Sequence, residues 1–346
     1  RFTGEPEFVQ NFFEFVAQEV REYLAAMGLR SLDEAIGRAD LLDTAKAVDH
    51  WKAHGLDVSP ILAGVDTDCA PRRTSPRPTD LHGTLDRTFI KACEAALSNG
   101  TPVSAQFEVR NTDRTVGTLL GSRVTRAFGG AGLPDGTINL HLVGSAGQSL
   151  GAFLPAGITL RLEGDANDYV AKGLSGGRVI VRPPESARCD DSNVIAGNVI
   201  AYGATSGEVF IRGVVGERFG VRNSGATLVV EGTGDHACEY MTGGRVIILG
   251  PTGRNVAAGM SGGLAHVLDI NPAQVNTELV DVESLRDDDA DAVHALLAAH
   301  AEHTGSPAAL ELLATWTTAR SRFVTLAPRE YRQALARTQS SEVAHG

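Results

Sequence analysis

Cysteine is scarce in this chain of 346 residues, which has four cysteines and no C-x-x-C pair. Such isolated thiols exclude a disulfide framework and an all-cysteine zinc site, and they favour a reducing, cytoplasmic environment. Long apolar runs are also missing, because none approaches 18 residues, so no membrane-spanning helix is expected. The chain begins Arg-Phe-Thr without an initiator methionine and without a visible secretory signal, and a fragment or a processed product is expected.

Basic charge is in deficit as well. Lysine and arginine number 31 against 42 aspartates and glutamates, which gives a net charge of -11 and a pI near 5.4. This balance argues against nucleic acid or an anionic membrane surface as the main partner. The motifs of P-loop, dinucleotide-binding, serine-hydrolase and zinc-protease sites are missing too. The sequence therefore predicts no catalytic residue, no cofactor-binding residue and no metal ligand.

Glycine is what the chain has in excess. It supplies 39 residues, about 11% against a norm of roughly 7%. Thirty of the 39 lie between Gly117 and Gly263, and no collagen period is present. Short strand-like runs alternate with these glycines. The expected strands are 103–109, 137–143, 158–163, 178–182, 194–201, 208–212, 227–231, 245–249 and 264–268.

The strands recur with a regular period. Their anchor residues follow one another every 18 to 21 residues, except for a step of 30 between Val179 and Val209, which predicts an insertion around residues 183–191. The phrase SGGRVIV at Ser175 returns as TGGRVII at Thr242 and as SGGLAHV at Ser261. Such a period without intervening helices indicates a solenoid, with glycines at corners that need positive φ. The predicted fold is mainly β, a right-handed parallel β-helix flanked by helical segments.

The flanks have ordinary composition. Helices are expected at 6–27, 31–37, 40–54, 86–98 and 113–128, and again at 290–301 and 307–318. The predicted division is a helical segment at 1–65, a linker and helix at 66–100, the β-helix at 101–270, a C-terminal helical segment at 271–338 and a disordered tail at 339–346.

Several residue clusters invite a functional interpretation. Asp235, His236, Cys238 and Glu239 have metal-ligand side chains, but they are expected to alternate between strand faces without a second cysteine or histidine to complete a site. Residues 250–255 (GPTGRN) look like a phosphate cradle, yet they are more simply one of the repeated corners.

A second group of candidates is charged. Arg178, Arg182, Arg188 and Arg212, with Glu185, Asp190 and Asp191, mark either a solvated face or a domain interface, of which the interface is the sharper prediction. His294, His300 and His303 are expected on the exposed side of an alanine-rich helix. Asp287, Asp288, Asp289 and Asp291 are expected to form a solvated run at a helix N-terminus.

The stretch from Gly144 to Leu268 closely resembles the C-terminal GXGXG domain of the glutamate synthase large subunit. The resemblance rests on long phrases such as GERFGVRNSGATLVVEGTGDHACEYMTGGRVIILG. Arg1–Arg38 is similar to the end of the flavin-binding barrel domain of that family, and VRNTDR and FVTLAPREY extend the match over nearly the whole chain.

This resemblance implies an oxidoreductase acting on CH–NH2 donors, which makes glutamate from glutamine and 2-oxoglutarate during ammonia assimilation. In the family, FMN and a 3Fe-4S cluster belong to parts outside this chain. The chain alone is therefore expected to be inactive and to hold the amidotransferase and flavin-barrel domains together. The small NADPH-oxidising subunit is a further expected partner of the assembly.

Two alternatives remain open. The first is a stand-alone GXGXG module in another oxidoreductase complex, such as formylmethanofuran dehydrogenase, although the match at Arg1–Arg38 speaks against it. The second is a β-helix enzyme with aligned carboxylates on one rung, which the Val, Ile, Leu and Arg content of the strands disfavours.

Overall fold

The computed structural model describes residues 4–64, 81, 83–187 and 193–334. The chain forms two compact units, Arg1–Asp80 and Leu81–Gly346. The predictions for residues 66–80 and for the tail at 339–346 lie outside the described residues, as do those for Arg188, Asp190 and Asp191. None of the helices in the described parts combines the length and apolarity needed to cross a bilayer.

The first unit is helical and has little core. Helix α1 (Pro6–Ala26) begins with proline in its first turn, where the missing N–H costs nothing. Its aromatic side chains are mostly exposed: Phe8 by 63%, Phe12 by 62% and Phe13 by 64%. Short elements follow, namely α2 (Leu32–Ala35), η1 (Ala39–Leu41), α3 (Ala45–Val48), η2 (Trp51–Ala53) and α4 (Ser59–Leu62). The helix predicted over 40–54 is wrong, because this stretch is divided into three short pieces.

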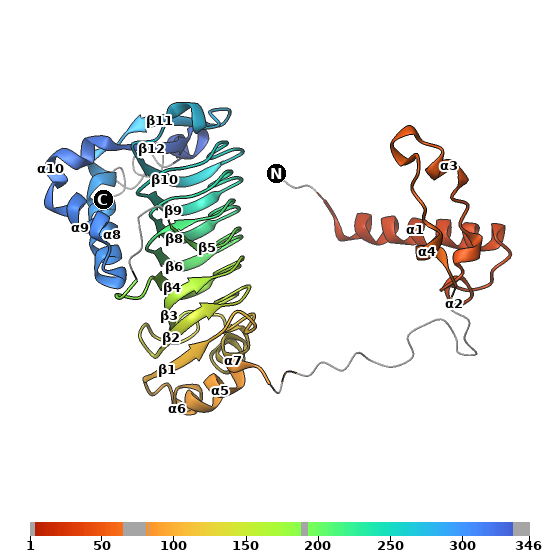
Figure 1. Cartoon of the computed structure of the whole chain (residues 1–346), viewed down its shortest axis with the longest axis horizontal. Coiled ribbons are helices and arrows are strands. Elements are labelled where there is room, and N and C mark those ends of the chain that lie inside the picture. Colours follow the sequence, from red (N-terminus) through yellow and green to blue (C-terminus); the bar gives the residue numbers. More distant parts are fainter. Residues whose placement is uncertain (1–3, 65–80, 82, 188–192, 335–346) are drawn as a thin grey trace. The chain divides into compact units, whose positions relative to one another are not determined.

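The second unit is built on a mixed sheet of twelve strands (Figure 1). The strands are β1 (Val103–Val109), β2 (Ile138–Ala146), β3 (Ile158–Ala166), β4 (Ser175–Arg182), β5 (Val194–Ala196), β6 (Ser206–Ile211), β7 (Val214–Val215), β8 (Ser224–Val230), β9 (Thr242–Ile248), β10 (Gly262–Leu268), β11 (Val280–Ser284) and β12 (Phe323–Pro328). The main order is β1-β2-β3-β4-β6-β8-β9-β10-β12-β11, and β5 pairs with β3 and β7 beside it.

The strands from β1 to β10 pair in parallel and in register with the repeat of the sequence. Ile138 lies opposite Ile158, and Val209 lies opposite Leu228. The prediction of a mainly β architecture made of parallel strands at the predicted period is therefore confirmed. The winding of these strands into a right-handed parallel β-helix stays a prediction.

Strands β4, β6, β8, β9 and β10 present side chains to two cores, whereas β1, β2 and β3 contribute to the inner one. The inward-facing residues, such as Leu140, Leu160 and Val179, are fully buried against the turns that connect the strands. The outward-facing Phe210 and Ile247 are buried under the C-terminal helices α8 (Asp287–Thr304), α9 (Pro307–Ala314) and α10 (Trp316–Ala319). Figure 1 shows these helices along one side of the strand stack. Strands buried on both faces explain the near-continuous apolar runs in the sequence.

Both ends of the stack are covered. At the β1 end lie α5 (Leu85–Ala92), α6 (Glu94–Asn99) and α7 (Thr118–Phe128), and Phe89 packs on Phe107 with ring centroids 4.7 Å apart. At the other end β12 pairs antiparallel with β10, and β11 follows it. Covered ends protect a repeat protein against end-to-end association.

Several sequence predictions need correction here. The helix predicted over 86–98 is broken at Cys93, and the helix predicted from Asp113 begins at Thr118 because Gly117 has a φ of +95°. The strand predicted over 194–201 ends at Ala196, since Val199 already lies in a turn with a φ of +62°. Strands β11 and β12 and the short β7 were not predicted.

Candidate functional site

The turns between the strands form a continuous ridge, which we call the turn ridge. In each turn, three alternate residues have positive φ. The sets are Ser149, Gly151 and Phe153; Tyr169, Ala171 and Gly173; Val199, Ala201 and Gly203; Arg218, Gly220 and Arg222; His236, Cys238 and Tyr240; and Asn255, Ala257 and Gly259. The prediction that glycine fills these corners is thus only partly right, because most of these positions carry a side chain. Each such residue stores about 1–2 kcal/mol of backbone strain.

Backbone hydrogen bonds between successive turns hold this strained conformation. The N–H of Tyr169 donates to the carbonyl of Asn198 at 2.9 Å, and the N–H of Val199 donates to that of Glu217 at 2.8 Å. The same link joins Arg218 to Asp235 and His236 to Arg254. A ladder of this kind satisfies buried backbone groups that would otherwise destabilise the fold.

Many glycines serve close packing between turns rather than positive φ. The Asp168 carboxylate accepts the N–H of Asn198 at 2.7 Å, and the Asn198 amide oxygen accepts the N–H of Glu217 at 2.8 Å. A Cβ on Gly197 would overlap Asp168, and one on Gly216 would overlap Asn198. The repeated glycine therefore makes room for the polar side chain of the preceding turn, which is a physical reason for the recurring motif.

The candidate metal cluster lies on the turn ridge, in a turn rather than in a strand as was predicted. Asp235 accepts from Arg254 Nε at 2.8 Å, and Glu239 lies 3.1 Å from Arg218 Nη1 and 3.8 Å from His236 Nδ1. The backbone N–H and the guanidinium of Arg254 lower the pKa of Asp235. Both carboxylates are therefore engaged with cations of neighbouring turns.

Cys238, the fourth member, is buried in the inner core. Burial raises the pKa of its thiol to about 12, so it remains a protonated, inert side chain. Among the described residues no group of three or more histidine, cysteine, aspartate or glutamate side chains is placed to hold a metal ion. The described thiols, Cys93 and Cys238, are both buried and do not fit the ligand set of an iron–sulfur cluster.

The corner at residues 250–255 is part of the same turn stack. Gly253 has no room for a Cβ beside Asp235, and the Thr252 hydroxyl donates to Gln274 at 3.3 Å. A shallow cavity of about 220 Å³ lies beside it, where Arg322 is paired with Asp269. These donors already have partners, which supports the structural interpretation of this corner.

The charged strand residues lie on the outer face of the sheet. Arg178 donates to Glu208 at 2.6 Å and to Asp135 at 3.2 Å, while Arg182 donates to Glu163 at 2.9 Å. Arg212 lies beside a cavity of about 490 Å³ that Glu163 and Glu231 also line. The structure thus places the described arginines of the predicted interface together along this outer face, beside the C-terminal helices of the same chain.

Two polar networks are buried where these helices meet the sheet, and neither was predicted. Ser306 donates to Glu231 and accepts the N–H of Ala309 at 3.0 Å, and His300 Nε2 lies 3.5 Å from Glu231. Burial raises the pKa of Glu231, but the hydrogen bonds of His300 and Ser306 outweigh it, and the pKa lies below its usual value. His300 is fully buried, so its predicted exposure is wrong.

The second network surrounds His266. Its Nε2 lies 2.6 Å from Arg245 Nη1 and its Nδ1 lies 3.0 Å from Thr325 Oγ1. The Asp289 carboxylate accepts one hydrogen bond from Arg245 Nη1 at 3.1 Å and another from Arg332 Nη2 at 2.8 Å. Asp289 is only 5% exposed, so its predicted place in a solvated acidic run is wrong. These side chains enclose a buried histidine and do not form an accessible nucleophile–base pair.

The comparisons with known proteins bear on these observations. The family model for the GXGXG motif matches residues 86–329. The NADPH glutamate synthase large chain of Bacillus subtilis is 46% identical over 99% of this chain and 23% of its own length. The NADH glutamate synthase of Schizosaccharomyces pombe is 47% identical over 97% of this chain and 16% of its own length.

Ferredoxin-dependent enzymes are similar as well. The chloroplastic ferredoxin-dependent glutamate synthase of Spinacia oleracea is 42% identical over 91% of this chain and 20% of its own length. The chain thus spans about a quarter or less of the relatives that it matches. The resemblance to glutamate synthase large subunits, read from the sequence, is confirmed.

Proposed function

Because the chain belongs to the GXGXG family, we propose that it is the C-terminal scaffold region of a glutamate synthase large subunit. The observation that carries this proposal is the identity of 46% with the Bacillus subtilis large chain, which runs over 99% of the residues. Identity over both units favours a piece of the large subunit over a stand-alone GXGXG module. The parent enzyme would make glutamate from glutamine and 2-oxoglutarate.

We further infer that the strand stack is a right-handed parallel β-helix. Parallel register over eight successive strands of the sheet and the backbone ladder between turns support this winding. Right-handed connection is the strong preference for parallel strands. On this basis the domain limits are residues 1–65, 66–100, 101–270, 271–338 and 339–346.

The role is structural, without catalytic residues of its own. The polar groups that looked chemically suitable are engaged in ion pairs, as Asp235 is with Arg254 and Arg178 is with Glu208. FMN and the 3Fe-4S cluster would belong to the remaining part of the subunit; of the thiols in the described residues, Cys93 and Cys238 are both buried and do not suit cluster binding. The amidotransferase and flavin-barrel domains, and the small NADPH-oxidising subunit, would be the partners, in the cytoplasm.

A scaffold needs rigidity more than reactive groups. The two cores, the covered ends and the strained but tightly bonded turns all favour a rigid body. Such a body would hold the glutamine-hydrolysing and glutamate-forming sites at a constant separation, so that ammonia passes between them without loss.

A chimera tests this role. The corresponding segment of the Bacillus subtilis large chain is replaced by these 346 residues, and glutamine- and 2-oxoglutarate-dependent glutamate formation is measured beside a variant that lacks the segment. We expect the chimera to retain activity and the deletion to lose it. If the deletion variant still hydrolyses glutamine but forms no glutamate, the arrangement of the two sites is what the deletion has disturbed.

The isolated chain provides the complementary test. Purified alone, it is expected to bind no flavin, to show no iron–sulfur absorbance and to consume no glutamine. Turnover of glutamine by the chain itself, or an active deletion variant, would show that the scaffold role is wrong.

A further inference from the structure

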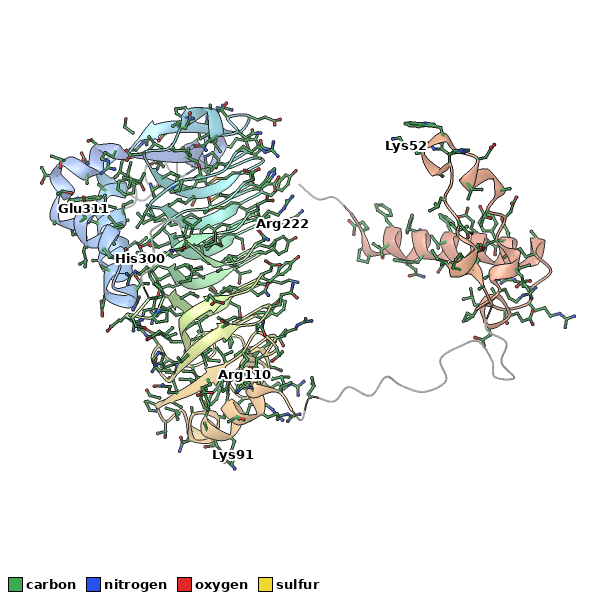
Figure 2. The ribbon with its side chains drawn as sticks, in the orientation of Figure 1. Lys52, Lys91, Arg110, Arg222, His300 and Glu311 are labelled. Atoms are coloured by element: carbon green, nitrogen blue, oxygen red, sulfur yellow. The ribbon has the colours of Figure 1, made fainter. Side chains whose placement is uncertain are left out.

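Five side chains form a cluster on the turn ridge, and we call it the ridge cluster. Its members come from three successive turns: Arg218, Arg222, His236, Tyr240 and Arg254. Figure 2 shows Arg222 pointing away from the strands at the turn side of the stack. The cluster combines guanidinium groups with an aromatic ring, the composition that dominates binding energy in protein interfaces.

The cluster is layered by charge. The side chains of Arg254 and Arg218 are 79% and 48% exposed, whereas their partners Asp235 and Glu239 are only 27% and 16% exposed. The carboxylates therefore lie beneath and the guanidinium groups lie outside. Glu217 is also exposed on this stretch. None of the ion pairs found among the described residues places a guanidinium group against its carboxylate.

The solvent-facing layer thus holds three guanidinium groups beside the exposed Glu217 carboxylate, on a chain whose net charge is -11. This contrast is the electrostatic signature of a surface that meets an acidic partner.

Two positions of the cluster are strained although glycine serves at the same place in adjacent turns. Arg222 has a φ of +56° and Tyr240 a φ of +52°, while Gly203 and Gly259 occupy the equivalent positions before and after them. The Arg222 guanidinium lies 5.8 Å from the centre of the Tyr240 ring, which is 54% exposed at residue level. The Tyr240 ring packs on Gly259 of the next turn, where a Cβ would lie 2.5 Å from it, so this side chain also serves the fold. Backbone strain at the solvated Arg222 side chain points to a use outside the folding of the turn.

Two of the three guanidinium groups are also tied to the central turn by ion pairs. Arg218 and Arg254 reach the central turn from opposite sides through their ion pairs with Glu239 and Asp235, at 3.1 and 2.8 Å. Side chains that are already ordered lose less conformational entropy on binding.

We propose that the ridge cluster is a docking surface for a carboxylate-rich segment of a protein. The guanidinium groups of Arg218, Arg222 and Arg254 bind its aspartate or glutamate side chains, and the Tyr240 ring packs against its apolar atoms. The proposal deepens the scaffold role and rests on it, because the acidic segment belongs to a domain or subunit that the scaffold holds.

The test uses the whole chain and a fluorescein-labelled, N-acetylated hexaglutamate peptide as the probe, with binding followed by anisotropy at low salt. We expect saturable one-to-one binding that weakens as salt is added. The double variant R222Q/R254Q is expected to bind about tenfold more weakly. A matched variant, K91Q/R110Q, removes two exposed cations elsewhere on the same unit and is expected to bind like the original chain.

Thermal unfolding of both variants establishes that each is folded, and Tyr240→Phe provides a second, conservative probe that keeps the ring. Absence of binding, or equal weakening by both double variants, would overturn the proposal. Tighter binding of a single-stranded oligonucleotide than of hexaglutamate would also overturn it. Because this assay needs no other domain, it can fail while the chimera remains active, and the two failures are distinguishable.

Discussion

The carboxylate of Asp86, on α5, caps the N-terminus of α7 more than thirty residues later in the chain. The N–H of Leu119 donates to its Oδ2 at 2.6 Å, and the N–H groups of Gly117 and Leu120 donate at 2.7 and 3.1 Å. Helix α7 has no side-chain cap of its own. Asp86 therefore binds the two helices of the β1 end together, although burial raises its pKa.

Replacing Asp86 with alanine is expected to lower the free energy of unfolding by about 2–3 kcal/mol, because three N–H groups at a helix N-terminus lose a charged acceptor. Urea unfolding measures the change. Asp86→Asn keeps the shape of the side chain but not its charge. Its free energy of unfolding should lie between those of the original chain and Asp86→Ala. The exposed Glu311→Ala is the control, and an equally small effect at Asp86 would contradict the capping role.

Glycine at position 197 is required for space. A Cβ there would lie 2.8 Å from the backbone nitrogen of Asp168 and would overlap its carboxylate, so Gly197→Ala should destabilise the chain by about 1–3 kcal/mol. Gly130→Ala is the matched control, since nothing lies within 4 Å of its Cβ and its φ is not positive. If chemical denaturation gives the same midpoint for both variants, the spacing role of this glycine is refuted.

Acid should weaken the fold through His266. Burial, together with the Arg245 guanidinium, lowers the pKa of this imidazole to about 3, so the folded chain keeps it neutral while the unfolded chain protonates it below about pH 6.5. The unfolded state then binds one more proton, and stability falls as the pH drops from about 6.5 towards 3, by up to about 1.4 kcal/mol per pH unit. The groups around the ring are Thr325, Asp289 and Arg332, besides Arg245.

The measurement is the free energy of unfolding at several pH values for the original chain and for His266→Gln. The variant should start lower at neutral pH and show a shallower decline on acidification. His294→Gln, at an exposed position of α8, should keep the original slope. Parallel pH profiles for the original chain and His266→Gln would rule out this imidazole as the source.

Substitutions at Arg222 separate the backbone strain at this position from the contribution of its side chain to stability. Glycine there would relieve about 1–2 kcal/mol of left-handed backbone strain, while the added freedom of the unfolded chain costs about 0.5–1 kcal/mol and the loss of the contact with Tyr240 up to about 1 kcal/mol. Arg222→Gly should therefore leave stability nearly unchanged, whereas the β-branched Arg222→Val should reduce it. A stability loss at glycine as large as at valine would show that the arginine side chain holds the turn.

Much of the strand architecture follows from local sequence. The strand predicted at 103–109 agrees with β1 at both ends, and those starting at Ile158 and near Val209 lie in the observed strands, because short apolar runs between glycines have few other ways to pack. Strands β11 and β12 were not predicted, because their antiparallel pairing depends on residues forty or more positions apart.

The buried polar groups could not be predicted for a related reason. His300 and Asp289 look like surface residues of an alanine-rich helix, and only the distant partners Glu231 and Arg245 explain their burial. The alternate left-handed residues of the turns carry no consistent residue type, so the corner positions of Arg222 and Tyr240 could be found only in the structure.

The stacking of repeats also fixes the length of the second unit. From β2 to β10 there are six steps along the sheet, and at about 4.8 Å a step they span about 29 Å. Since each repeat touches mainly the repeats beside it, a chain with one repeat more or fewer would change this span by a single step and leave both ends as they are. The number of repeats, which the sequence encodes, therefore sets the distance between the two ends of the stack in fixed steps.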